Sequence, residues 1–293
     1  MQKSTDNITL SIIFHNEGEP MEIETRRPKQ FLTKASGFLS QYTHTLNPYM
    51  GCQFACEYCY VRKSPISIFS GKTWGEWVTI KEDLDNQFLK ELQREKRKGP
   101  VTVFMSSSTD PYQPIEKHQQ ITRHLLKVLS QEPPDYVFIQ TRGPLIQRDI
   151  DILKNYPGRF IVSMTIETDR EDVIRTFTPH APSIKSRLIA LQKLRQHGIP
   201  TQIAIAPILP CTDQFARVIK PYTERVTIDD YFMGDGSNGK RTASLNIEKN
   251  YQLLNADNWY QRDAYRYVVQ LMEKEFGKEN VNISIDGFLP QLS

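Results

Sequence analysis

Three of the chain's four cysteines lie within eight residues, in the spacing Cys52-x3-Cys56-x2-Cys59. No other feature restricts the possible folds and functions so strongly, because closely spaced thiolates in a short loop are typical of a metal site. A 4Fe–4S cluster normally takes four thiolate ligands, so three cysteines leave one iron without a protein ligand. Such an iron can bind a substrate or a second cofactor. The loop therefore predicts an iron–sulfur site with one open coordination position.

Two other interpretations of the cysteine loop are open. Zinc could take the three thiolates and a nearby imidazole such as His44, but structural zinc sites usually add a second pair of ligands well downstream, and the sequence has none. Disulfides are also possible, yet an odd local triplet without a secretion signal is not typical of an extracellular disulfide framework. The spacing favours the iron–sulfur cluster over both.

The cysteine loop resembles that of the radical S-adenosylmethionine (SAM) superfamily, in which this spacing is combined with an aromatic residue just before the third cysteine. Tyr58 is that residue here. Segments 47–52 (NPYMGC), 56–62 (CEYCYVR) and 109–114 (TDPYQP) resemble the branch of spore photoproduct lyases and DNA repair photolyases, and the resemblance extends over residues 40–215. It implies that the open iron binds the amino and carboxylate groups of SAM, and that the reduced cluster cleaves SAM to a 5′-deoxyadenosyl radical.

The same resemblance implies partners. An external electron donor of the flavodoxin or ferredoxin type would reduce the cluster, and a nucleic-acid base is one candidate substrate. The composition does not decide the second point. Lys and Arg total 37 against 34 for Asp and Glu, and the resulting net charge of +3 is too small to indicate nucleic-acid binding by itself.

The length fits one catalytic domain, because 293 residues can bury one large core. The N-terminal residues lack the apolar stretch of a signal peptide, and no run of about 18 apolar residues occurs. We therefore expect a cytoplasmic protein without a membrane segment.

Strand and helix patterns alternate along the middle of the chain. Strands are expected at 45–50, 101–105, 136–140, 160–164, 201–206 and 226–229, and helices at 83–98, 122–130, 145–155 and 183–197. Such alternation implies right-handed βαβ units and a parallel sheet. We predict an α/β fold, a partial (β/α)6 TIM-type barrel, which is also the radical SAM core that the resemblance implies.

Shorter extensions are expected on both sides of this core. Residues 1–44 form an N-terminal extension that begins with a predicted strand at 8–14, and residues 45–230 form the barrel. Residues 231–293 form a C-terminal extension with a flexible loop at 234–239 and an amphipathic helix at 257–276, packed on the barrel.

Polar residues follow several predicted strands, and in parallel α/β barrels the functional residues gather at those carboxyl ends. By resemblance, the residues that contact the cofactors are Tyr58 beside the cluster, Ser107, Thr109 and Asp110 near the SAM amino group, Arg142 at its carboxylate, Ser163 at a polar contact and Ala206 at the adenine edge. A guanidinium can hold a carboxylate through two hydrogen bonds, which suits Arg142. Ordinary strand-end hydroxyl groups and a structural ion pair would explain the same residues without a cofactor.

The hydrogen donor is the point where this chain departs from the resemblance. Spore photoproduct lyases place a hydrogen-donating cysteine in the loop after the second strand, whereas residues 106–108 are serines here. We therefore do not expect the same route of repair. Tyr60, which with Tyr58 matches tyrosines of the lyases' hydrogen-atom relay, and Cys211, the remaining thiol, are the candidate catalytic residues. Aromatic packing would explain Tyr60 as well, and most lone cysteines are simply small buried apolar residues.

Three classes of function remain. The leading one is a radical SAM enzyme that abstracts hydrogen from a substrate such as a nucleic-acid base. A radical SAM enzyme that modifies a peptide or small molecule is the second, since fold and cofactor do not name a substrate. The third is a non-catalytic zinc or iron–sulfur module.

Overall fold

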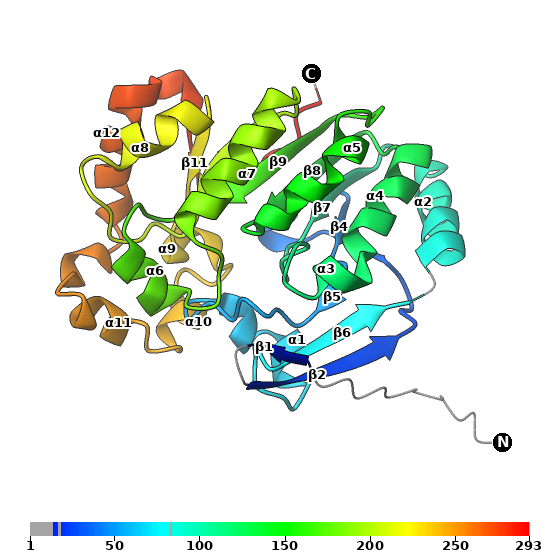
Figure 1. The fold of residues 1–293 in the computed structure, drawn as a ribbon, viewed down its shortest axis with the longest axis horizontal. Helices are drawn as coiled ribbons and strands as arrows, with labels where there is room; N and C mark the ends of the chain where they lie inside the picture. Colours follow the sequence, from blue (N-terminus) through cyan, green and yellow to red (C-terminus); the bar gives the residue numbers. More distant parts are fainter. Residues whose placement is uncertain (1–13, 17–18, 83, 293) are drawn as a thin grey trace.

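A long sheet in the order β12-β11-β10-β9-β8-β7-β4-β3 forms the centre of the molecule (Figure 1). The computed structural model describes residues 14–16, 19–82 and 84–292. The strands of this sheet are β3 Leu32–Lys34, β4 His44–Leu46, β7 Thr102–Met105, β8 Tyr136–Thr141, β9 Phe160–Thr165, β10 Thr201–Ile205, β11 Val226–Ile228 and β12 Val281–Ile283. All neighbours are parallel except β3 and β4. The predicted parallel α/β fold is confirmed.

Both edges of the long sheet come from outside the predicted barrel. β3 belongs to the expected N-terminal extension and β12 to the expected C-terminal one. Among the described residues, these two edge strands pair with β4 and β11 and not with each other, so the described sheet is open. Neither edge strand was predicted, because three residues are too few to show the alternation that identifies a strand.

The prediction of one strand over 45–50 is wrong, because the chain changes sheets within it. β4 ends at Leu46, and β5 Tyr49–Met50 pairs instead with β6 Trp77–Lys81. Pro48 lies between the two strands. It has no backbone N–H to continue the ladder with β7, so the chain turns away and delivers the cysteine loop from the second sheet.

The second sheet has the order β1-β2-β6-β5 and lies below the long sheet in Figure 1. Its first strands are β1 Phe14–Asn16 and β2 Glu19–Arg26. The predicted strand over 8–14 lies, apart from Phe14, outside the described residues. Trp74 and Trp77 are buried here and pack edge to face with ring centroids 6.2 Å apart, as expected for covering aromatics.

Helices cover one face of the long sheet, with α4, α5 and α7 lying across β7, β8 and β9 in Figure 1. The helices are α1 Pro65–Ile68, α2 Leu89–Lys96, α3 Glu116–Gln119, α4 Ile121–Gln131, α5 Ile150–Leu153, α6 Glu171–Phe177, α7 Ile184–Gln196, α8 Phe215–Ile219, α9 Tyr231–Gly234, α10 Lys240–Ala243, α11 Glu248–Leu253 and α12 Ala264–Phe276. Ser183 caps α7 as its sequence predicts, accepting a hydrogen bond from the Ser186 N–H.

Two predicted helices are less regular than expected. The helix over 83–98 begins as a π-type turn, Leu84–Phe88, before α2. The helix over 145–155 is mainly a 3-10 turn, Pro144–Asp149, before the short α5. The predicted helix over 257–276 starts later, at Ala264, because residues 257–259 form a separate 3-10 turn.

Neighbouring residues along each central strand face opposite sides of the sheet. Val103 and Met105 pack with the helices in the main core, whereas Phe104 and Phe138 lie on the inner face and stack with ring centroids 4.9 Å apart. Phe288, from the C-terminal segment, joins these rings. Aromatic side chains therefore fill the inner face below the strand ends, and a site has room only beyond them.

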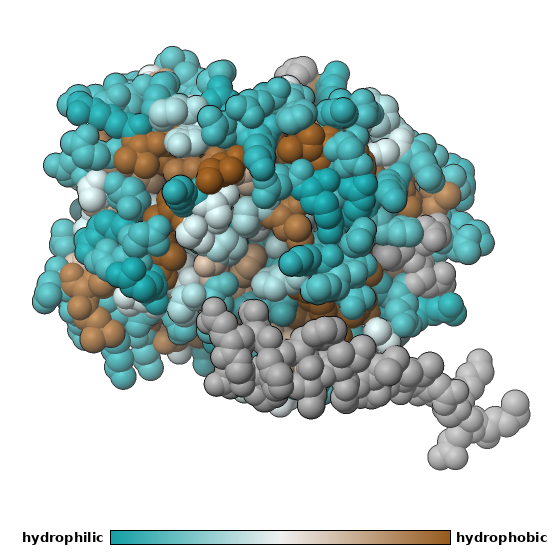
Figure 2. Space-filling view, in the orientation of Figure 1, coloured by the Kyte–Doolittle hydropathy of each residue, from teal (hydrophilic) through white to brown (hydrophobic). Residues whose placement is uncertain are grey.

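The face of the molecule seen in Figure 2 is mostly hydrophilic, with apolar side chains in separate patches. The longest described helices, α7 and α12, have 13 residues each, whereas a helix that spans a bilayer needs about 20. None of the helices within the described ranges is long and apolar enough to cross a membrane.

Candidate active site

The three predicted cluster cysteines line a single cavity of about 130 Å³, here called the cysteine cavity. Cys52, Cys56 and Cys59 follow β5 in tight turns, and none of them forms a disulfide. Gly51 makes the first turn possible, because its φ is +79° and a side chain there would come within 2.2 Å of the Trp77 carbonyl oxygen. The local backbone thus brings three free thiols to one cavity.

The loop of residues 110–116 holds the cysteine loop in place. Gln113 accepts a hydrogen bond from the Gln53 backbone N–H (2.8 Å) and donates one to the Gly51 carbonyl (3.2 Å). In return, the Gln53 side chain accepts a hydrogen bond from the Ile115 N–H (2.6 Å). All of these groups are buried, so water does not compete for the bonds and they fix the loop firmly.

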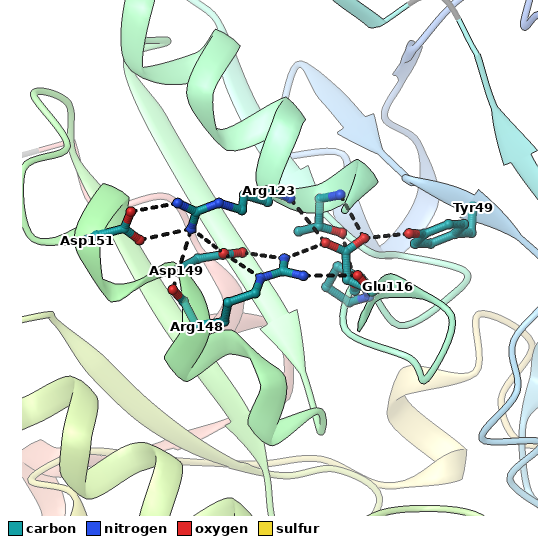
Figure 3. A network of polar contacts seen from close by, with 8 residues as sticks. Tyr49, Glu116, Arg123, Arg148, Asp149 and Asp151 are labelled. Carbon is teal, nitrogen blue, oxygen red and sulfur yellow. Dashed lines mark hydrogen bonds and ion pairs between the residues drawn. The ribbon is translucent and has the colours of Figure 1, made fainter. Parts of the chain in front are cut away.

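Glu116, at the end of that loop, connects it to a buried network of charges (Figure 3). Its carboxylate accepts hydrogen bonds from the Tyr49 hydroxyl, three residues before the first cysteine, and from Arg148 Nη2 (2.5 Å). Arg148 also pairs with the fully buried Asp149 (2.8 Å). From the interior outward, the members are Tyr49, Glu116, Arg148, Asp149, Arg123 and Asp151.

The polar loop after β7 forms another part of the cavity wall. The Asp110 carboxylate accepts hydrogen bonds from the Tyr112 N–H (2.9 Å), the Thr141 hydroxyl (2.6 Å) and the Arg142 N–H (2.8 Å). Burial raises the pKa of Asp110 while these three bonds oppose the shift. Asp110 therefore serves to hold the loop. By contrast, the buried Ser106 hydroxyl has no partner among the described residues and is available to a ligand.

Arg142 is the cation next to the cysteines. Its Nη1 donates to Cys56 Sγ (2.8 Å) and to the Tyr58 hydroxyl (2.8 Å), and it pairs with Glu167 Oε1 (3.0 Å). Glu167 is fully buried and also pairs with Arg187 (2.7 Å). Burial alone would raise the pKa of Glu167, but the two guanidinium groups outweigh it and lower the pKa. The ionised carboxylate therefore fixes Arg142 beside a cysteine sulfur.

Burial also sets the protonation of the thiols. It raises the pKa of Cys56 to about 11, against the opposing effect of Arg142. It raises the pKa of Cys52, to which the charge of Asp110 adds, and that of Cys59. The thiolate form thus needs positive charge nearby, which Arg142 supplies in part and a metal cluster would supply more fully.

Two larger cavities adjoin the cysteine cavity. The aspartate cavity, about 200 Å³, is named after Asp229, Asp230 and Asp235 in its wall. The mouth cavity, about 560 Å³, has a wall that includes Lys34, Phe38, Phe104, Arg241 and Phe288. Tyr60 and Arg142 line all three cavities, so these two side chains stand where the cavities meet.

The structure brings most of the predicted site residues to these cavities. Besides the three cysteines, they are Tyr58, Tyr60, Ser107, Thr109, Asp110, Arg142 and Ala206. Ser163 lies elsewhere: it is fully buried two residues before Thr165, and its hydroxyl accepts a hydrogen bond from Gln202 (3.2 Å). Because side chains alternate along a strand, Thr165 is the β9 residue that occupies the inner face at the strand end.

Cys211 also lies apart from the three cavities, contrary to the expectation that it faces the radical site. It is buried in the main core, near the carboxylates of Asp169 and Asp213. The preceding segment explains this position. Thr168 donates a hydrogen bond to the Pro210 carbonyl (2.6 Å), which fixes the chain against the turn after β9 before it reaches Cys211.

The donor set fits a cluster better than a single zinc ion. His44 begins β4, whereas the cysteines follow the other end of that strand, and its Nε2 lies 3.7 Å from Glu95. In the described part of the chain, no three His, Cys, Asp or Glu side chains converge on one metal ion. A cluster distributes its thiolates over separate irons and does not need such convergence. Three free thiols with a guanidinium beside one of them suit that arrangement.

Sequence reasoning missed four residues of the site, Gln140, Glu167, Asp229 and Asp230. All lie at or just after the carboxyl ends of strands, so the rule that identified Asp110 and Arg142 could have found them. One side-chain oxygen on each of Gln140, Asp229 and Asp230 is buried with no partner in the described ranges. Such acceptors are costly to leave unpaired, which is typical of a site prepared for a ligand.

Comparison with known proteins agrees with this geometry. The sequence profile of the radical SAM superfamily matches residues 46–219, more than half of the chain. The chain belongs to the radical SAM superfamily. An uncharacterized protein of Methanocaldococcus jannaschii is 28% identical over 241 residues, covering 81% of this chain and 89% of the relative. The radical SAM Nalpha-GlyT isomerase of Pseudomonas phage M6 is 26% identical over 164 residues, covering 56% of this chain and 32% of the isomerase.

Solved structures of radical SAM enzymes share the fold. Spore photoproduct lyase complexed with dinucleoside spore photoproduct matches with a TM-score of 0.62, over 89% of this chain and 81% of that chain, at 16% identity. At this identity the match establishes the fold alone. Membership of the radical SAM superfamily implies an iron–sulfur cluster and SAM as cofactors, and the residues around the cysteine cavity fit both.

Proposed function

We propose that this radical SAM protein holds a 4Fe–4S cluster on Cys52, Cys56 and Cys59 and binds SAM beside it. When bound, the two cofactors supply a 5′-deoxyadenosyl radical by reductive cleavage of SAM, and the radical abstracts hydrogen from a substrate. One observation carries the proposal: the cavity lined by the three thiols adjoins two larger cavities, and Tyr60 and Arg142 line all three.

Arg142 is the proposed partner of the SAM carboxylate. The contacts described above use only its Nη1, so Nε and Nη2 can donate to a second carboxylate. Glu167 keeps the guanidinium in place when the ligand leaves. Ser107 and Thr109, on the neighbouring loop, offer hydroxyl oxygens for the amino group.

The aspartate cavity suits the adenosine part of SAM. Its wall includes Ala206, the predicted adenine edge, together with Asp229 and Asp230. Each of these carboxylates has one buried oxygen without a partner in the described part of the chain, and ribose hydroxyls or an adenine amino group can donate to such oxygens.

The mouth cavity suits a substrate that carries a planar aromatic base. Phe38, Phe104 and Phe288 supply apolar surface for a ring, and the unpartnered Gln140 oxygen supplies an acceptor for an N–H group. Lys34 and Arg241 in the same wall attract a phosphate. The names of the phage isomerase and of the lyase complex support a nucleic-acid substrate, because they refer to modified thymine and to a dinucleoside photoproduct.

Tyr60 is the proposed hydrogen-atom relay. Its hydroxyl donates to the Ser107 carbonyl (2.8 Å) at the junction of the cavities. Burial, with a contribution from Cys59, raises the pKa of Tyr60 to about 12, so the hydroxyl keeps its hydrogen at neutral pH. Cys211 takes no part in this proposal, since it lies outside the three cavities.

Anaerobically reconstituted protein with dithionite and SAM tests the proposal. We expect 5′-deoxyadenosine, measured by liquid chromatography and mass spectrometry, in amounts that rise with oligonucleotides but not with peptides. Tyr60→Phe should still cleave SAM but should slow modification of the substrate about tenfold or more. Tyr156→Phe, at a buried tyrosine away from the cavities, is the matched control and should behave like the wild type. Stimulation by peptides alone would refute the nucleic-acid assignment.

A further inference from the structure

Helix α1, which follows the cysteine loop, carries a compact exposed apolar patch. Ile66, Ile68 and Phe69 are 37%, 60% and 85% exposed. They account for three of the nine large apolar side chains that are exposed among the described residues, and they lie within four positions of the sequence. α1 begins only six residues after Cys59. An apolar patch held this close to the cluster site is typical of an interaction surface.

A groove next to this patch lies directly outside the cysteine cavity. It has a volume of about 390 Å³ and is lined by Arg62, Lys63, Ser67, Ile68, Gly71, Lys72, Trp74 and Leu245. Trp74 also lines the cysteine cavity and is 5% exposed. One indole ring therefore forms the partition between the groove and the thiols. A partner seated in the groove would be separated from the cluster by little more than that aromatic ring.

The charge of the groove is one-sided. Arg62, Lys63 and Lys72 line it, and none of its described lining residues is acidic. Lys72 pairs with Glu22 and Glu24 at the rim, and Arg62 is bound to the cysteine loop through the Cys56 carbonyl (3.0 Å). Lys63 forms no ion pair among the described residues and remains free to meet a partner.

We propose that the groove and the α1 patch together form the docking surface for a small acidic one-electron carrier protein with a flavin or an iron–sulfur centre. The proposal rests on the proposed function, which requires one external electron for each SAM cleaved. The carrier is oxidised by one electron and the cluster is reduced by one. Charge complementarity favours this partner, since acidic side chains would meet Lys63 while apolar atoms cover Phe69.

Two variants of the surface test the proposal with a purified flavodoxin as the probe. Lys63→Glu reverses the free charge, and Ile68→Ser with Phe69→Ser removes the apolar patch. Both should raise the dissociation constant of flavodoxin, measured by calorimetry, about tenfold or more. They should also slow flavodoxin-driven formation of 5′-deoxyadenosine by a similar factor, while the rate with dithionite stays within about twofold. Added salt should weaken wild-type binding more than it weakens Lys63→Glu.

Matched controls come from other exposed positions. Leu253→Ser on α11 removes an apolar side chain that is 76% exposed, and Lys185→Glu reverses an exposed charge on α7. Both should leave the dissociation constant and both rates unchanged. If the α1 variants behave like these controls, or if dithionite and flavodoxin rates fall together, the docking surface is refuted. A change of oligomeric state in the α1 variants, seen by light scattering, would instead assign the patch to contact between copies of the chain and would also refute it.

The binding measurement separates this inference from the proposed function. If neither reductant yields 5′-deoxyadenosine, the proposed function is refuted. The docking surface is then judged by the dissociation constants alone, and unchanged values would refute it as well.

Discussion

At the scale of single residues, Arg142 balances the charges of the site. It joins the Cys56 sulfur to Glu167, which Arg187 also contacts from the other side. All three ionised groups are largely or fully removed from water. The cation is therefore held where a thiolate and an incoming carboxylate both need positive charge.

Replacing Arg142 should destabilise the fold as well as the site. Arg142→Met leaves Glu167 with one guanidinium instead of two, and we expect the free energy of unfolding to fall by about 3 kcal/mol in urea titrations. Arg170→Met is the control, because the pair of Arg170 with Asp172 is partly exposed and should contribute less than about 1 kcal/mol. Equal losses in the two variants would contradict the central position given to Arg142.

Asp229 makes stability depend on pH. Burial, with repulsion from Asp230, raises the pKa of Asp229 to about 7, above its value in the unfolded chain. The folded state therefore holds this proton more tightly, so the contribution of Asp229 is most favourable below pH 4 and is lost as the pH rises to about 7. Asp229→Asn should match the wild type near pH 4 and exceed it at pH 8 by up to about 4 kcal/mol.

Asp235→Asn provides the control with the opposite sign. Hydrogen bonds from Gly239 and Ser237 outweigh burial and lower the pKa of Asp235, so its contribution is present at neutral pH and is lost as the pH falls below its usual range. This variant should be less stable than the wild type at pH 8. Thermal unfolding at pH 4, 6 and 8 checks both signs, and parallel pH curves for the three proteins would contradict them.

At the scale of elements, the loop of residues 110–116 positions the cysteine loop. The paired amides of Gln53 and Gln113 join the two loops, and the network of Figure 3 anchors the second loop to α4 and α5 through Glu116. The cysteines therefore depend on charges that lie outside the cavity walls.

Glu116→Ala should loosen the cysteine loop. It leaves the Tyr49 hydroxyl and one side of Arg148 without their acceptor, and we expect a loss of about 3 kcal/mol in the free energy of unfolding. Iron bound after reconstitution should fall as well. Asp151→Ala, at the 58% exposed end of the same network, should cost less than about 1 kcal/mol and leave iron binding intact. Full iron binding by Glu116→Ala would show that the loop holds its shape unaided.

The elements that the sequence predicts best are those with a long period. The amphipathic pattern of α7 and the apolar runs of β8 and β9 extend over enough residues to be read directly. β3 and β12 have three residues each and depend on pairing with neighbours distant in the sequence. The exchange of sheets at Pro48 depends likewise on β6, which lies 30 residues further along. Such tertiary pairing leaves no local signal.

At the scale of the whole molecule, the open sheet determines which predicted residues meet. Arg142 and Ala206 follow strand ends on the inner face, and both reach the cavities. Ser163 was selected at the correct strand but one layer too deep, since register decides the layer. Cys211 was selected for its chemistry, but the path of the chain after β10 carries it into the main core. Sequence thus predicts which strand ends carry the site, while pairing decides which side chains enter it.

Electron paramagnetic resonance of the anaerobically reconstituted, reduced protein tests the central claim most directly. Cys52, Cys56 and Cys59 should bind four irons and four sulfides per chain and give a reduced-cluster signal that shifts when SAM is added. Cys211→Ala should give the same signal and the same shift. One zinc per chain, or a cluster whose signal is indifferent to SAM, would contradict the account.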